Sequence, residues 1–323
     1  MKIQHNMTKR QFASEVLRLY DPLGIIQPII ITAKILLQGL WKIKLNWDDE
    51  IPQETLHEWR KLKMALPKLT KLEFPRCAIP SKVKHLELHG FSDASMLAYG
   101  CAIYAHATDH EGNETMNLLC SKSRVAQLKE LTLPRKECLG AKLLAQLMAR
   151  VIHNIPNQVS RVHYWCDSKV VLAWIHSDEP HDEIYVRNRI NIIQTLSNKH
   201  DWQYVPTNEN PSDLVSRGIS VEKLLTAKRK LWINRTEYVL KERNTQMYVI
   251  LREPAAPKQK DDAEQHSQVE DFIQMYPHHN SFQKTRRHFA LILRAVNNFL
   301  AKLRHNRYWA QSKRTNWTEE LNL

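Results

Sequence analysis

The feature that most constrains the fold is a change in the spacing of apolar residues at His85. From there, apolar and polar residues alternate in three segments, HLELHGFSDAS, AYGCAIYAHA and NLLCSKSRV, and a polar stretch, ATDHEGNET, separates the second from the third. Alternation with a period of two indicates half-buried strands, and short polar connections favour antiparallel neighbours. The sequence therefore predicts three consecutive antiparallel strands.

A long amphipathic helix is predicted next, in TLPRKECLGAKLLAQLMARVIHNI. Pro134 stands near its start, and one apolar stripe follows, made of Leu139, Leu143, Leu147 and Val151 at steps of four with Leu144 and Met148 beside them. A strand (RVHYWCDS), two helices (KVVLAWIHS and EIYVRNRINIIQTLSNK), a strand (DWQYVP) and the start of a last helix (PSDLVSRGI) are predicted after it. The order β-β-β-α-β-α-α-β-α predicts an α/β fold with a five-stranded mixed sheet flanked by helices.

The rest of the chain divides around this domain. Residues 1–80 are predicted to form a small helical module, because apolar residues recur at helical spacing on both sides of a DPLG turn and again after Pro52. The sheet domain takes 81–235. Residues 236–280 are predicted to be a linker, since they combine prolines and mixed charge with few large apolar side chains. Residues 281–323 are predicted to form a basic amphipathic helix.

Composition narrows the class of partner. The 323 residues carry 47 Lys and Arg against 34 Asp and Glu, a net charge of +13, which favours polyanions such as nucleic acid. The five cysteines include no C-x-x-C pair, so reduced thiols in an intracellular, cytoplasmic protein are expected rather than a disulfide framework or a zinc site. The apolar stretch 25–40 is short and interrupted by polar residues, so we expect no membrane association.

Four acidic residues are predicted to stand where the elements of the sheet end or begin. Asp93 is placed at the end of the first strand, Glu137 in the first turn of the long helix, Asp167 at the end of the fourth strand and Asp213 at the start of the last helix. Side chains from such places converge at one edge of an α/β sheet. Taken singly, each has a structural alternative: Asp93 could cap a turn, Asp167 could cap the next helix, and the other two could favour helix N-termini.

Clustered carboxylates repel one another unless a cation is present, so the four together favour a site for hard metals. Magnesium is the expected cofactor, as two ions about 4 Å apart that catalyse in-line phosphodiester hydrolysis. Mn²⁺ could replace it. The chain has neither a G-x-x-x-x-G-K-[ST] nor a G-x-G-x-x-G motif, so a nucleotide-cradling loop is not expected.

The motifs FSDAS, LPRKECLGA, YWCDSKVVLAWI and NPSDLVSRG, in this order, resemble the ribonuclease H (RNase H) domain of BEL/Pao-class (Pao family) LTR retrotransposon polyproteins. The stretch from Thr8 to Pro52 resembles the connection between reverse transcriptase and RNase H, and the tail resembles the helical stretch before the integrase. The resemblance covers roughly residues 8–235.

This resemblance implies an RNase H-like fold and a metal-dependent endonuclease that cleaves the RNA strand of an RNA–DNA hybrid. Its carboxylates would match Asp93, Glu137, Asp167 and Asp213. Partners would be the hybrid and other pol-derived proteins, and a virus-like particle is a further location. Three more residues are candidates for contacting substrate: Ser95, which could sense a ribose 2′-OH or simply complete a turn, and Asn210 and Arg217, which could steer phosphate or fix the loop.

Two alternatives remain. Many RNases H have a histidine in the loop before the last Asp, whereas the corresponding loop here, VPTNENPS, has none. The sequence also contains no catalytic region of a polymerase or an integrase. A catalytically inactive polyprotein fragment that only binds nucleic acid is therefore the second hypothesis. An aspartic peptidase is the third, but it requires D-[ST]-G, and Asp93 is followed by Ala-Ser and Asp167 by Ser-Lys.

Overall fold

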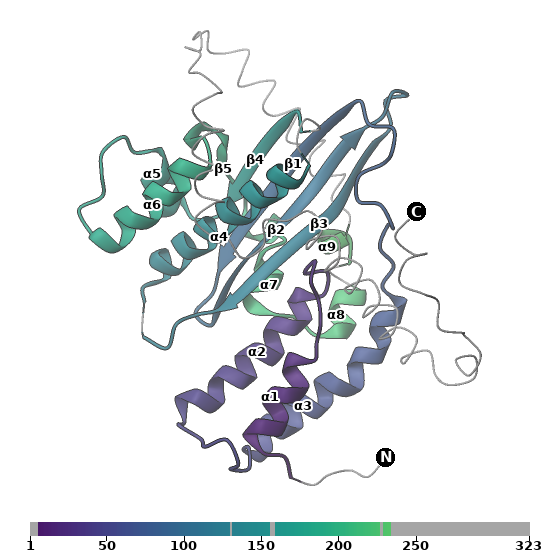
Figure 1. Cartoon of the computed structure of the whole chain (residues 1–323), viewed down its shortest axis with the longest axis vertical. Coiled ribbons are helices and arrows are strands. Elements are labelled where there is room, and N and C mark those ends of the chain that lie inside the picture. The colour runs from purple at the N-terminus through teal and green to yellow at the C-terminus, as the bar shows by residue number, and fades with distance from the viewer. Residues whose placement is uncertain (1–5, 130, 156–158, 227–228, 234–323) are drawn as a thin grey trace, which may run out of the picture. The chain divides into compact units, whose positions relative to one another are not determined.

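A five-stranded mixed sheet organises the structure, a computed structural model that describes residues 6–129, 131–155, 159–226 and 229–233 (Figure 1). The strands lie in the order β3-β2-β1-β4-β5. Their bounds are β1 His85–Ala94, β2 Ala98–Thr108, β3 Glu114–Val125, β4 Arg161–Cys166 and β5 Trp202–Tyr204. The first three strands pair antiparallel, and β4 pairs in parallel with β1 and β5. The predicted RNase H-like α/β class and its mixed sheet are confirmed.

Helices cover both faces of this sheet. Their bounds are α1 Lys9–Leu17, α2 Gln27–Lys42, α3 Gln53–Ala65, α4 Leu133–Asn154, α5 Lys169–His176, α6 Ile184–Leu196, α7 Asp213–Arg217, α8 Val221–Leu225 and α9 Arg229–Ile233, with short 3-10 helices η1 Leu66–Lys71, η2 Lys199–Asp201 and η3 Thr207–Glu209. None of the described helices is both long enough and apolar enough to span a membrane. Strands β1 and β2 are buried almost throughout, because both of their faces are covered.

One hydrophobic core lies between the sheet and α4, with α5 and α6 beside that helix. The predicted stripe on α4 faces the sheet, but it is not buried evenly. Leu139 and Leu143 are buried, whereas Leu147 and Val151 are only half-buried. Leu144 and Met148 of the same stripe, together with small residues such as Ala145, make the centre of the contact. The helix therefore approaches the sheet closely and leaves Leu147 near its edge.

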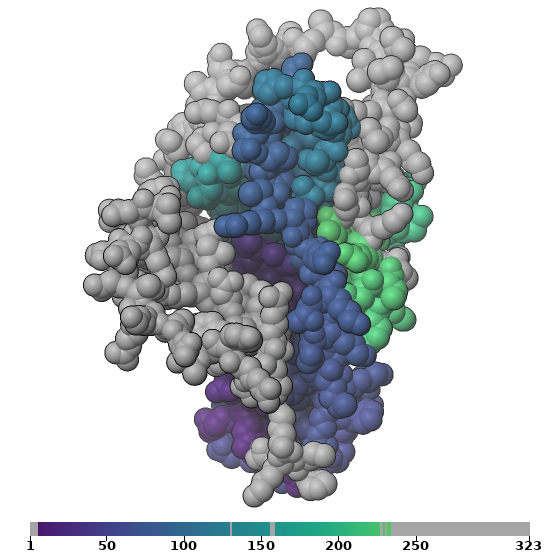
Figure 2. Space-filling model, turned by 90° about the vertical axis from the view of Figure 1, so that its right-hand side faces the viewer, coloured from purple at the N-terminus to yellow at the C-terminus, as the bar shows by residue number. Residues whose placement is uncertain are grey.

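The second core lies on the opposite face and joins the sheet to α1, α2, α3 and the short helices α7 to α9. Phe12 and Trp59 are fully buried there and meet edge to face with ring centroids 5.3 Å apart, a contact worth about 0.5–1.5 kcal/mol beyond its area. Figure 2 shows the blue segment that contains α3 and η1 beside the green α8, where Lys68 and Glu222 form an ion pair of 2.7 Å. The predicted helical module thus shares a core with the sheet.

Local sequence explains the ends of these elements. Thr8 and Gln11 form a reciprocal capping box at the start of α1. Asp21 of the DPLG turn accepts hydrogen bonds from the amides of Ile25 and Ile26, which fixes the entry to α2. The predicted single last helix is wrong: α7 ends after five residues at Gly218, whose φ of +77° lies in the left-handed region, and α8 and α9 follow.

The described residues cover the first two of the four predicted parts of the chain. Contacts divide it into two compact units, Met1–His278 and His279–Leu323, and all described residues belong to the first. The predicted linker at 236–280 and the predicted basic helix at 281–323 lie outside the described residues. All five cysteines lie within them and are free.

Candidate active site

Asp93 and Asp167 lie side by side at the same edge of the sheet. Ser92 of β1 is in register with Cys166 of the parallel strand β4, so the residues that follow them belong to neighbouring strands about 4.8 Å apart. Asp93 is 4% exposed, and Asp167 is half-buried. The predicted convergence of these two acids follows from the parallel pairing of β1 with β4.

Glu137 lies on α4, which packs closely against the part of β1 that carries Asp93. A Cβ on Gly140 would lie 2.9 Å from the backbone oxygen of Asp93, so only glycine lets the helix approach β1 this closely. Glu137 precedes that contact by three residues, about one helical turn. It was predicted in the first turn of the helix, but α4 begins at Leu133, which places Glu137 just past that turn.

Asp213 is the first residue of α7, as predicted, and hydrogen bonds hold this segment against the end of β1. Ser216 of the same helix donates to Asp93 Oδ2. Ser212 donates to the carbonyl of Phe91 at 2.8 Å, and Asn210 donates to the carbonyl of Ser92 at 2.9 Å. The loop before α7 is therefore fastened to the strand that carries Asp93.

The pKa values of Asp93, Asp167 and Glu137 show that neighbouring carboxyls act on one another. Burial first, and then the carboxylates of Asp167 and Asp213, raise the pKa of Asp93 to about 7 against a lowering hydrogen bond from Ser216. Burial is also the main cause of the raised pKa of Asp167; hydrogen bonds from Thr207, from its own backbone amide and from Asn210 lower it, and Asp213 raises it by a smaller amount. The pKa of Glu137 is raised by burial and by Asp167. The four predicted acids therefore form one electrostatically coupled group.

These residues fit a hard divalent cation. Asp167 Oδ1 is buried and has no hydrogen-bond partner in the described part of the chain, as expected of an oxygen whose partner is a metal. Arg217 is ion-paired with Asp213 through Nε but is 59% exposed, so it offsets only part of the negative charge. Carboxylate oxygens are the preferred ligands of Mg²⁺ and Mn²⁺.

The three candidate substrate contacts have different environments. The Ser95 hydroxyl donates to the carbonyl of Ser216 at 2.8 Å and accepts from the amide of Ala98 at 3.1 Å, so it closes the β1–β2 turn. Asn210 is fully buried and also accepts from the amide of Ser212 at 3.0 Å, which fixes the loop. Arg217 is the most accessible of the three.

Two further residues shape the site and were not identified in the sequence. Ser216 binds Asp93, and its position three residues after Asp213 on a predicted helix was the available sign, because residues at that spacing share a face. Ser168 caps α5 by accepting from the amide of Val171 at 3.3 Å. The alternative that Asp167 caps this helix is therefore wrong, and the carboxylate of Asp167 can take part in the group of four acids.

A second group of ligand-type side chains lies elsewhere on β1 and β2. Among the described residues, ligand atoms of Glu87, His89 and His106 lie within 4.8 Å of one another, a closer grouping than the four acids make. Glu87 Oε2 is 3.5 Å from His89 Nε2 and 3.6 Å from His106 Nδ1. Along β1, His89 is four residues from Asp93, roughly 13 Å, so the two groups are separate.

A hydrogen bond argues against metal binding in this histidine group. Trp165 Nε1 donates to His89 Nδ1 at 3.3 Å, so the proton of the neutral ring lies on Nε2 and faces Glu87. Burial lowers the pKa of His89 to about 4, so the ring is neutral at pH 7. A ligating Nε2 would have to lose that proton. We therefore interpret the group as a buried polar network around Glu87.

The chain is similar to known proteins in its sequence family and in its fold. A family model described as "Pao retrotransposon-like RNaseH-like domain" matches residues 8–168, which include Asp93, Glu137 and Asp167 but not Asp213. No curated protein sequence matches the chain significantly.

Similar solved structures are RNases H and a retroviral polyprotein. The N-terminal RNase H domain of a Mycobacterium tuberculosis protein is 10% identical over 41% of this chain and 94% of its own, with a TM-score of 0.28. LC11-RNase H1, isolated from compost and solved with an RNA/DNA hybrid, is 15% identical over 44% and 99%, with a TM-score of 0.28. Prototype foamy virus protease-reverse transcriptase is 15% identical over 56% and 24%, with a TM-score of 0.23.

Proposed function

We propose that this chain, which over residues 8–168 belongs to the Pao retrotransposon-like RNaseH-like domain family, cleaves the RNA strand of RNA–DNA hybrids with the help of divalent metal. The observation that carries the proposal is the pair Asp93 and Asp167. They stand on adjacent parallel strands, their pKa values are raised by burial and by neighbouring carboxylates, and a buried oxygen of Asp167 lacks a partner among the described residues. Such a pair is stable in its charged form only beside a cation.

The four acids would hold the metal. Asp93 and Asp167 would contribute oxygens from the sheet, Glu137 from α4 and Asp213 from α7. When bound, a pair of Mg²⁺ or Mn²⁺ ions supplies an activated water and neutralises charge on the scissile phosphate and its leaving oxygen. The protein's own contribution is to fix these carboxylates from four different elements, so that little reorganisation is needed during the reaction.

Arg217 would assist with the substrate. Its guanidinium is exposed, stands beside Asp213 and can donate to a phosphate oxygen. Ser95 and Asn210 are assigned to the scaffold, because their side chains already make hydrogen bonds within the protein. Recognition of the RNA strand would then depend on contacts with the ribose 2′-OH from the backbone near the turn after β1.

The proposed setting follows from the same reasoning. A polyprotein-derived nuclease would act on the hybrid beside other pol-derived proteins, in the cytoplasm or within a virus-like particle. The free thiols of Cys101, Cys138 and Cys166 are buried in the protein and are compatible with a reducing compartment.

The test is cleavage of an RNA–DNA hybrid labelled on either strand by the full chain in Mg²⁺ or Mn²⁺, with EDTA and double-stranded RNA as controls. Metal-dependent cutting confined to the RNA strand of the hybrid is expected. Asp167→Asn should slow cleavage by about 100-fold or more, because it removes a metal ligand, yet still bind the hybrid in Ca²⁺. Asp182→Asn, at an exposed acid outside the cluster, is the matched control.

Three results would change this assignment. Equal cleavage by Asp167→Asn and the unsubstituted protein would remove the acids from the mechanism. Hybrid binding without cutting in either metal would favour the alternative of an inactive nucleic-acid-binding protein. Cutting that persists in EDTA would contradict the use of metal.

A further inference from the structure

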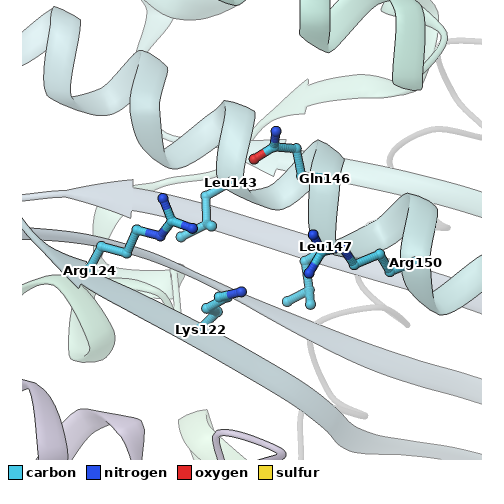
Figure 3. A pocket seen from close by; sticks show the side chains of 6 residues that line it. All are labelled: Lys122, Arg124, Leu143, Gln146, Leu147 and Arg150. Carbon is cyan, nitrogen blue, oxygen red and sulfur yellow. The ribbon is translucent and has the colours of Figure 1, made fainter. Parts of the chain in front are cut away.

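A basic groove lies between the edge strand β3 and helix α4. We call it the β3–α4 groove, and it is lined by Lys122, Arg124, Leu143, Gln146, Leu147 and Arg150. Figure 3 shows the two β3 cations on one side and the α4 side chains on the other, with the charged ends of Lys122, Arg124 and Arg150 around one space. Every polar group in this lining other than the Gln146 carbonyl is a hydrogen-bond donor.

The positive charge of the groove is not compensated within the described part of the chain. Some exposed cations elsewhere pair with acids, as Arg10 does with Asp48 at 2.8 Å and Lys68 with Glu222 at 2.7 Å. No described acid forms an ion pair with the three cations of the β3–α4 groove. The pKa of Lys122 is lowered by burial first and then by Arg150 and Arg124, so the three groups repel one another. An anion between them would relieve that repulsion.

The shape and composition of the groove favour a sugar-phosphate backbone over a small free anion. Arg124 and Arg150 are exposed, and each guanidinium can donate two hydrogen bonds to a phosphate. Lys122 is half-buried between them. Leu147 of α4, which is half-buried, adds apolar surface against which a sugar could lie. A phosphate of the backbone can lie in the space between the three cations, while the exposed Arg124 and Arg150 can also reach the phosphates on either side of it.

The groove also lies within reach of the carboxylates. Lys122 is in register with Cys101, which is in register with Ser92, so it stands two strands from β1, roughly 10 Å away. Along α4, Gln146 and Arg150 follow Glu137 by about 13 and 20 Å at 1.5 Å per residue. At about 3.4 Å of rise per nucleotide, that separation corresponds to roughly four to six nucleotides of a duplex.

We propose that the β3–α4 groove binds the sugar-phosphate backbone of the RNA–DNA hybrid a few nucleotides away from the bond that the four carboxylates cleave. The inference rests on the proposed function for the identity of its ligand. The groove increases affinity and sets the register of the duplex, and it takes no part in the chemical step.

The test uses Lys122→Gln, Arg124→Gln and Arg150→Gln together in the full chain. The matched control carries Lys42→Gln, Lys61→Gln and Lys71→Gln, which remove the same charge from exposed positions of the helical module. Binding of an 18-base-pair hybrid in Ca²⁺, followed by fluorescence anisotropy over a salt series, should weaken about 10- to 100-fold for the groove variant. The slope of log K against log salt should fall by about 2 to 3, since each phosphate contact contributes about 0.9.

Cleavage kinetics separate this inference from the proposed function. In Mg²⁺ the groove variant should show a KM raised by a similar factor and a kcat within about twofold of the unsubstituted protein. If the protein cuts no hybrid but the groove variant still loses binding and salt dependence, the groove assignment holds and the nuclease assignment fails. If cutting occurs and the groove variant binds and cuts like the control, the groove assignment is overturned.

Folding is controlled by circular dichroism and by the pair Arg124→Gln and Arg150→Gln, both at exposed positions, which should give about two thirds of the change in salt slope. A normal salt slope in this folded pair would likewise contradict the assignment. Binding that falls equally for the groove variant and the control would show that only net charge matters, and would also overturn it.

Discussion

Replacing Asp93 by Asn is expected to stabilise the metal-free protein at high pH. Asp93 is 4% exposed, and burial together with the neighbouring Asp167 raises its pKa to about 7, whereas an unfolded chain titrates Asp near 3.9. Between these values the folded protein holds a proton that the unfolded chain has lost. Stability therefore falls as the pH rises through this window, by up to about 1.4 kcal/mol per pH unit.

The expected magnitude follows from the width of the window. Three pH units at about 1.4 kcal/mol each give an upper limit near 4 kcal/mol, and sharing of the titration with Asp167 reduces it, so we expect about 2–4 kcal/mol. Asn carries no charge at any pH and keeps an oxygen that can accept the hydrogen bond from Ser216. The free energy of unfolding of Asp93→Asn should exceed that of the unsubstituted protein by this amount at pH 8 and by almost nothing at pH 4.

The assay is urea unfolding followed by tryptophan fluorescence, with EDTA present, at pH 4, 6 and 8. Asp182→Asn controls for the loss of one surface charge. Adding Mg²⁺ at pH 8 should stabilise the unsubstituted protein through binding to the folded state and should have much less effect on Asp93→Asn. A difference between the two proteins that does not grow with pH would refute the conclusion that the metal-free site suffers from buried negative charge.

Two more predictions concern α7 and its surroundings. Ser216→Ala removes a hydrogen bond that lowers the pKa of Asp93, so the Mg²⁺ concentration for half-maximal cleavage should rise about 10-fold, and an unchanged half-saturation would count against the contact. Gly218→Ala should lower the free energy of unfolding by about 1–3 kcal/mol, because φ is +77° and the new Cβ would lie 2.5 Å from Thr32 Oγ1. Gly39→Ala, in open space on helix α2, is its control and should instead stabilise by up to about 1 kcal/mol in urea unfolding. A similar decrease in the free energy of unfolding in both variants would show that the effect at Gly218 does not come from its positive φ.

The order of strands and helices could be predicted because each element has its own period. Alternation of apolar and polar residues predicted β1 and β3, and apolar residues at steps of four predicted α4. The positions of Asp93, Asp167 and Asp213 could be predicted because they depend on where strands end and a helix begins, whereas α4 starts one turn before Glu137. Which side of the α4 stripe is buried most deeply could not be predicted in the same way. Leu147 and Val151 have the helical spacing of buried residues, yet they are half-buried, because the deepest contact with the sheet is made by Leu144, Met148 and Ala145.

Contacts between distant segments were beyond the reach of local patterns. The polar network of Glu87, His89 and His106 lies on the side of β1 and β2 that faces the second core. The sequence of a strand with alternating polar residues does not show whether its polar side is exposed or covered by other elements. The same holds for Lys122, Arg124 and Arg150, which are separate basic residues in the sequence. Only the antiparallel register of β3 and the packing of α4 bring them together.

The packing of α2 links the helical module to the RNase H-like domain. Helix α7 carries Asp213 and Ser216 but has only five residues, too few to be stable alone. Its C-terminal end rests on α2, where the amide of Ile219 donates to the carbonyl of Pro28 at 3.0 Å. Without α2, one side of α7 would lose its support, and the fourth acid would no longer be held beside Asp93. The helical module therefore acts on the site through the position of α7, although it contributes no acid to the cluster.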